Sequence, residues 1–135
     1  MSQLVSHQEN RIVYRVSRAK CEDYASRSLE PALDFTLKTL GGLESFVRPA
    51  QKVILKPNWI GPFSSDDPAI TNPNLLLALS RRLVNLGADV SIADSPAWGD
   101  AAKVARCCGM EKETERLGVN IVTLNQPRKI RLDSG

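Results

Sequence analysis

Short strand-like runs alternate with helix-length stretches along this chain, and this alternation constrains the fold more than any other feature. Val53-Ile54-Leu55, Asp89 to Ala93 and Asn120 to Leu124 have the composition of strands. The stretches between them are long enough for helices. Such alternation predicts right-handed βαβ crossovers, so we expect an α/β fold with three layers and a mainly parallel sheet.

Two further strands are expected near the ends of the chain. Ile12 to Val16 is β-branched and aromatic, and Arg128 to Leu132 could begin a fifth strand. The Val53–Leu55 run is continuously apolar and lies between Pro49 and Pro57. A run of this kind is typical of a strand that is covered on both faces.

Three helices are expected between these strands. Leucines at helical spacing predict the first helix between about residues 24 and 40, beginning near Ser28 or Leu29 with Pro31 in its first turn. Thr71 or Asn72 caps the second helix, which Gly87 ends. The third runs from about residue 100 to 117, with a break near Gly109 and an end at Gly118. The helix signals therefore agree with the strand pattern.

The domain organisation follows from length and polarity. Residues 1–10 are polar and are expected to form a flexible leader, and residues 11–135 are expected to form a single α/β domain. The chain stops just after the possible strand start at Arg128. This suggests the amino-terminal part of a longer domain, although a small complete fold fits equally well.

Composition narrows the class of protein. Hydrophobic residues make up 42% and charged residues 24% of the 135 residues, which is typical of a globular chain. The net charge of +3 is too small for a nucleic-acid footprint, and the basic clusters near both ends are interpreted as solvated strand faces. No apolar run is long enough to cross a bilayer, and the start lacks the apolar centre of a secretory signal. We expect a soluble, cytoplasmic protein with no nucleic-acid or membrane partner.

The residues that metals and nucleophiles require are sparse. Cys21, Cys107 and Cys108 fit reduced thiols, and His7 is the single histidine. No CxxC pair, dinucleotide fingerprint, P-loop or GxSxG elbow occurs, so we expect no metal site and no serine triad. Proton transfer would depend on Lys56, Asp94 or the loop aspartates.

The candidate site lies in two loops that follow strands. Ligands of open parallel sheets bind outside the carboxyl ends of the strands. Lys56 and Asp94 are the candidate catalytic residues, because they would stand within reach of one another if their strands are neighbours. The candidate substrate-binding residues share the same two loops and are Asn58, Trp59, Thr71, Asn72, Ser95 and Trp98.

Each candidate also has a structural interpretation. Lys56 could pair with Asp94 as a strap, and Asn58 could stabilise its own turn. Trp59 and Trp98 could wall a pocket or fill the core beneath the loops. The helix that starts at Thr71-Asn72 could bind an anion through its free N–H groups. These alternatives stay open at the level of sequence.

An ordered set of motifs resembles a known family. Val53-Ile54-Leu55-Lys56-Pro57-Asn58, then Ala69-Ile70-Thr71-Asn72-Pro73, then Leu86 to Pro96 resemble the amino-terminal half of the domain-of-unknown-function-362 family. The resemblance covers roughly residues 11–132. Some members of the family are iron–sulfur proteins with ferredoxin-type cysteine motifs, which this chain lacks. Members usually continue beyond the point where this chain ends.

Three functions remain in order of preference. The first is a small-molecule site, or half of an enzyme, for a small anionic ligand. Lys56 would neutralise the anion and Asp94 would act as base or metal ligand. The second is a non-catalytic assembly module that completes its sheet as a homo-oligomer or with a missing carboxyl-terminal half. Iron–sulfur electron transfer is the third. The sequence assigns neither a cofactor nor an enzymatic reaction.

Overall fold

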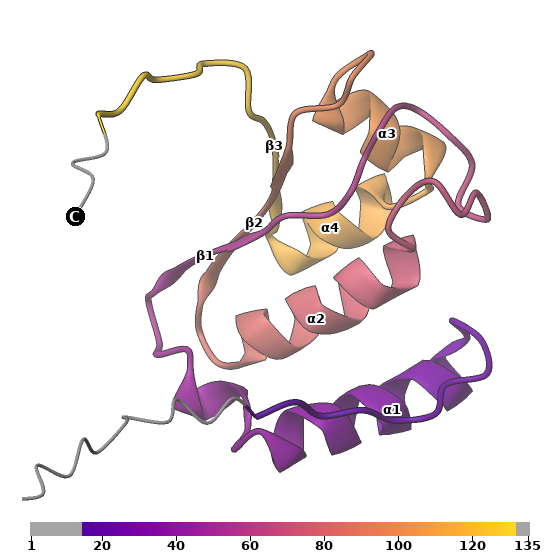
Figure 1. Ribbon diagram of the computed structural model, residues 1–135, viewed down its shortest axis with the longest axis vertical. Coiled ribbons are helices and arrows are strands. Elements are labelled where there is room, and N and C mark those ends of the chain that lie inside the picture. Colours follow the sequence, from indigo (N-terminus) through magenta and orange to yellow (C-terminus); the bar gives the residue numbers. More distant parts are fainter. Residues whose placement is uncertain (1–14, 132–135) are drawn as a thin grey trace, which may run out of the picture.

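The computed structural model describes residues 15–131, which form a three-stranded sheet with helices beside it (Figure 1). The strands are β1 (Lys52–Leu55), β2 (Asp89–Asp94) and β3 (Asn120–Thr123). They are parallel and lie in the order β1-β2-β3. The predicted α/β class, with a parallel sheet and βαβ crossovers, is confirmed.

The helices occupy the stretches between the strands. Helix α2 connects β1 to β2, and α3 and α4 together connect β2 to β3. The helical elements are α1 (Ser26–Thr39), the 3-10 turn η1 (Leu43–Ser45), α2 (Pro73–Asn85), α3 (Ala101–Cys107) and α4 (Glu111–Leu117). The expected break of the third helix lies at Gly109, whose φ of 70° is left-handed.

Helix α2 begins and ends where its capping residues predict. The Asn72 side chain accepts a hydrogen bond from the backbone N–H of Asn74 at 3.0 Å, and Pro73 takes the first helical position. After the helix, Gly87 adopts a φ of 80°. The local sequence therefore defines both ends of this helix.

The predicted start of α1 is wrong by two to three residues. The helix begins at Ser26, because the carbonyl of Ala25 accepts the N–H groups of Ser28 and Leu29. Pro31 consequently lies inside the helix, beyond its first turn. No side chain caps this start, so no cap residue in the sequence marks it.

The two terminal strands are absent from the described residues. Arg15 and Val16 have no regular structure, and the rest of the expected first strand lies outside the described range. Residues 128–131 are also irregular, and Leu132 lies outside that range. Neither segment pairs with β1 or β3 in the described part of the chain.

The hydrophobic core lies between the sheet and the helices α2, α3 and α4. Ile92 of β2 and Met110, which precedes α4, are both 0% exposed. The core also includes Trp59 of the long loop, Leu83 of α2 and Val104 of α3. Burial of these side chains on one face holds the crossover helices against the strands.

The opposite face of the sheet is open in the described part of the chain. Ile54 is 64% exposed, Leu124 is 43% exposed and Val122 is 39% exposed. All labelled helices lie to one side of the sheet in Figure 1. The expectation that β1 is covered on both faces is therefore wrong for residues 15–131, and the second helical layer of a three-layer fold is not among them.

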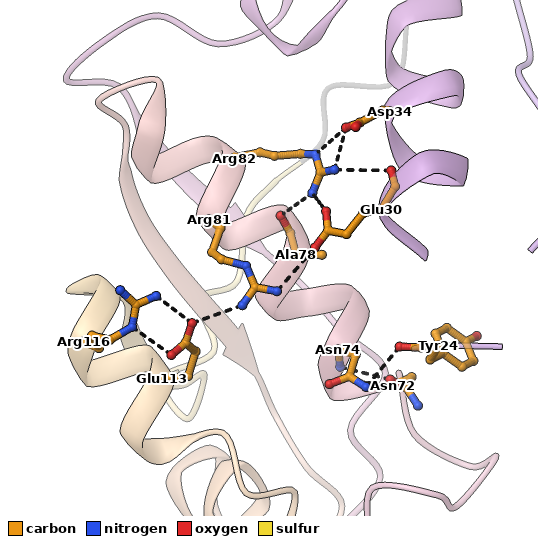
Figure 2. A network of polar contacts seen from close by, with 10 residues as sticks. All are labelled: Tyr24, Glu30, Asp34, Asn72, Asn74, Ala78, Arg81, Arg82, Glu113 and Arg116. Carbon is orange, nitrogen blue, oxygen red and sulfur yellow. Dashed lines mark hydrogen bonds and ion pairs between the residues drawn. The ribbon is translucent and has the colours of Figure 1, made fainter. Parts of the chain in front are cut away.

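Helix α1 packs outside α2, and ion pairs join them (Figure 2). The guanidinium of Arg82 on α2 contacts Asp34 Oδ1 at 2.5 Å and Glu30 Oε2 at 2.5 Å, both on α1. The Arg82 side chain is 19% exposed, so these pairs are partly shielded from water. They attach α1 to the rest of the domain.

The same network continues to α4. Arg81 lies 3.1 Å from Glu113 and 3.5 Å from Glu30, and Arg116 also contacts Glu113. Hydrogen bonds from Arg116 and Arg81 lower the pKa of Glu113 to about 2. Glu113 therefore remains ionised, and the network links α1, α2 and α4.

Candidate functional site

The carboxyl ends of the strands carry the two loops in which the candidate residues lie. The long loop after β1 folds back on itself through an antiparallel bridge between Trp59 and Ile70. The backbone N–H of Asn58 donates to Thr71 Oγ1 at 2.8 Å, and the N–H of Thr71 donates to the carbonyl of Asn58 at 3.0 Å. Asn58 and Thr71 thus order this loop.

Asp94, at the end of β2, joins both loops. Its Oδ1 accepts hydrogen bonds from Lys56 Nζ at 2.5 Å and from the N–H of Ser95 at 2.9 Å. Its Oδ2 accepts from the N–H of Trp59 at 2.7 Å. The Asp94 side chain is 6% exposed, whereas that of Lys56 is 63% exposed. The ion pair therefore has one buried and one accessible partner.

The surroundings of Asp94 favour its ionised form. Burial alone would raise the pKa of this carboxyl, but hydrogen bonds from Lys56, Trp59 and Ser95 outweigh it and lower the pKa. A carboxylate with a lowered pKa and occupied oxygens is a weak proton acceptor at neutral pH. The geometry suits a residue that positions the two loops and the Lys56 ammonium.

The two tryptophans have different environments. Trp59 is 1% exposed and fills the core, as the second interpretation of the sequence allowed. Trp98 is 54% exposed, and its ring meets Phe63 edge to face with centroids 5.8 Å apart. The indole of Trp98 lies so close to Gly61 that a side chain there would overlap it. Trp98 alone can offer a ring to a ligand.

The start of α2 is already occupied by its own chain. Besides capping Asn74, the side chain of Asn72 donates to the carbonyl of Ser65 at 3.5 Å. Thr71 is engaged with Asn58 in the same way. Both residues therefore order the long loop and the helix start in this structure.

A hollow of about 720 Å³ lies at the ends of β2 and β3. Its lining is polar and apolar side chains from the two strand ends, namely Ser95, Thr123, Leu124, Asn125, Gln126 and Pro127. The sequence analysis did not select Asn125 and Gln126. Their position directly after a predicted parallel strand is the signal that could have found them, because such strands end at the same edge.

The candidates thus divide into two groups. Lys56, Asp94 and Ser95 are brought together by direct hydrogen bonds, and Ser95 also lines the hollow. Asn58, Thr71 and Asn72 hold the long loop. Within residues 15–131, no group of three or more histidine, cysteine or acidic side chains is placed to hold a metal ion. No helix in that range is long and apolar enough to cross a membrane.

Comparison with known proteins identifies the family. The open parallel sheet and its strand-end loops define an α/β domain, and residues 53–135 match the family described as Domain of unknown function (DUF362). This match covers more than half of the chain. The protein belongs to this family.

One curated relative extends the match toward the amino terminus. A thylakoid-associated protein of Synechocystis sp. is 32% identical over 111 residues, which are 82% of this chain. They are only 35% of the relative, so this chain spans about a third of its length. No solved structure matches the chain.

Proposed function

We propose that this domain binds a small anionic ligand at the carboxyl edge of its sheet, with Lys56 as the anchoring cation. The observation that carries the proposal is the asymmetry of the Lys56–Asp94 pair. Asp94 is buried and holds the ammonium in place, while the Lys56 side chain remains 63% exposed. A fixed, accessible ammonium at a strand end can attract a carboxylate or a phosphate.

Neighbouring groups would complete the recognition. The hydroxyl of Ser95 and the amides of Asn125 and Gln126 line the adjoining hollow and can donate hydrogen bonds. The exposed ring of Trp98, in the same loop as Ser95, can contact an apolar part of the ligand. Asp94 would position these groups, and the proposal assigns it no proton transfer.

The test is ligand-induced thermal stabilisation. Inorganic phosphate and malonate are added separately to the purified chain and to two variants, Lys56→Met and Lys52→Met. Lys52 is an exposed lysine at the opposite end of the same strand, so it is a matched control for loss of one positive charge. We expect the melting temperature to rise with at least one anion in the wild type and in Lys52→Met, and to stay unchanged in Lys56→Met.

Folding of the variants is checked by circular dichroism, because Lys56→Met removes one partner of a buried carboxylate. If Lys56→Met folds and responds to the anions as the wild type does, the proposed site is wrong. An equal loss in Lys52→Met would show a non-specific charge effect and would also contradict it.

A second candidate function, assembly with another polypeptide, is favoured by the exposed side chains of Ile54, Val122 and Leu124. The location of the protein also remains a proposal. The relative's name associates that protein with the thylakoid, and we propose a cytoplasmic location for this chain from its sequence alone.

A further inference from the structure

The order of the strands explains why all crossover helices cover one face. From β1 to β2 to β3 the chain moves across the sheet in a single direction. Parallel connections are almost always right-handed, so every step in that direction places its helix on the same side. Helices α2, α3 and α4 follow this rule, and they lie together on one side of the sheet in Figure 1.

The opposite face has the composition of a buried surface. Ile54 on β1, Ala93 on β2 and Val122 on β3 project to it, and the central Ala93 is only 1% exposed although no helix of the described chain covers it. Parallel sheets occur almost only with both faces covered. The exposed fractions of Ile54, Val122 and Leu124 therefore indicate a missing layer.

The handedness rule also says where that layer must come from. A strand added beyond β3 would place its helix on the face that α2 already covers. A strand added beside β1 reverses the direction of winding and places its helix on the open face. In residues 15–131 the free edge of β1 is available for such a strand.

We infer that β1 is an interior strand of a larger doubly wound sheet, in which a further parallel strand pairs with its free edge and a crossover helix covers Ile54, Val122 and Leu124. The occupant is the type of polypeptide that the Synechocystis relative carries outside the shared region. That relative matches over only 35% of its length, so almost two thirds of it is available for this role.

Charge adds a property of the occupant. Lys52 is exposed on β1, two residues from Ile54 and therefore on the same face of the strand. A covering helix with an apolar stripe over Ile54 and an acidic side chain near Lys52 would complement this surface. An acidic, amphipathic helix is the expected partner chemistry.

The inference also completes the ligand site, and in this step it rests on the proposed function. In doubly wound sheets the ligand crevice opens where the winding direction reverses. That point would be the carboxyl end of β1, directly at Lys56. The ligand would then lie between the loops of this chain and those of the added strand.

Titration calorimetry tests the interaction. The purified chain is titrated with the polypeptide that corresponds to the part of the Synechocystis relative outside the shared region. We expect a one-to-one complex that is lost, by at least tenfold in affinity, in Ile54→Glu and in Val122→Glu. Phe35→Glu is the control, because Phe35 is 58% exposed on α1, away from the sheet. It should bind as the wild type does.

Three results would overturn the inference: no complex, a complex that both face variants retain, or a dimer of this chain that Ile54→Glu converts to a monomer in light scattering. A crystal structure of the complete relative gives a second readout. It should show a parallel strand beside the equivalent of β1 and a helix over the equivalent of Ile54. The anion experiments use Lys56 and leave these results unchanged, so the two proposals fail separately.

Discussion

At the scale of single residues, Asp94 determines how the two strand-end loops are arranged. Its two oxygens accept hydrogen bonds from Lys56 and from the backbone of Trp59 and Ser95. The sequence placed Lys56 and Asp94 together correctly, because polar residues at the ends of neighbouring parallel strands share one edge. The hydrogen bonds to backbone amides depend on the loop path, which the sequence does not define.

Asp94→Asn should destabilise the fold by about 2–4 kcal/mol, because an amide replaces a charged acceptor and turns a donor toward other donors. Urea denaturation monitored by circular dichroism measures the change. Asp89→Asn is the control, since Asp89 is exposed at the other end of the same strand, and it should change stability by less than about 0.5 kcal/mol. Equal effects of the two substitutions would contradict the role of Asp94.

The stability of the fold should also depend on the ionisation of Asp94. The folded state lowers the pKa of this carboxyl. Its contribution is therefore complete above the unfolded value of about 3.9 and is lost as the pH falls through the folded pKa. Denaturation curves between about pH 5 and pH 2 should fall more steeply for the wild type than for Asp94→Asn. Parallel pH profiles would show that Asp94 is not responsible.

The tryptophans show a limit of sequence reasoning at this scale. Trp59 and Trp98 both follow a strand end in a polar loop, and the sequence left the same two interpretations open for each. The structure buries Trp59 beneath the bridge to Ile70 and leaves Trp98 exposed. The difference arises from tertiary packing of the loops, and nothing in the local sequence distinguishes the two residues.

At the scale of elements, α1 is held by polar contacts as much as by packing. Leu29 is its one fully buried residue within the described range, and Arg82 bridges it to α2 through Glu30 and Asp34 (Figure 2). The sequence predicted the leucine stripe of this helix but not these ion pairs. Pairing between distant helices depends on how they cross, which is a property of the fold.

Arg82→Met should loosen α1, with a loss of about 1–3 kcal/mol, because it removes charge-assisted hydrogen bonds that are partly shielded from water. Hydrogen exchange should become faster across Ser26–Thr39 and change little in β2. Arg106→Met is the control, because its pair with Glu111 is exposed and should contribute less than about 1 kcal/mol. Unchanged exchange in α1 would show that packing alone holds it.

At the scale of the whole molecule, the sheet has one buried and one open face. The sequence predicted the α/β class and the parallel strands, because the alternation of strands and helices depends only on local pattern. It also predicted cover on both faces of β1, and this was wrong for residues 15–131. A continuous apolar run indicates that both faces are suited to burial, but it does not say which polypeptide covers them.

Two isoleucines on opposite faces test this asymmetry. Ile92→Ala should cost about 2–5 kcal/mol, because Ile92 is 0% exposed and the change leaves a cavity in the core. Ile54→Ala should cost at most about 1 kcal/mol, since Ile54 is 64% exposed and loses mainly strand propensity. Chemical denaturation of both variants measures the difference. Similar losses would mean that the face with Ile54 is already covered in solution.

The central claim, an anion site beside Lys56, is tested most directly by nuclear magnetic resonance. Inorganic phosphate is titrated at millimolar concentrations into the ¹⁵N-labelled chain, and backbone amide shifts are followed. The account predicts that the shifts change at Lys56, at Ser95 and at residues 123–126, and that Lys56→Met abolishes them. Changes confined to the cleft of about 480 Å³ between α1 and α2, or no changes at all, would contradict it.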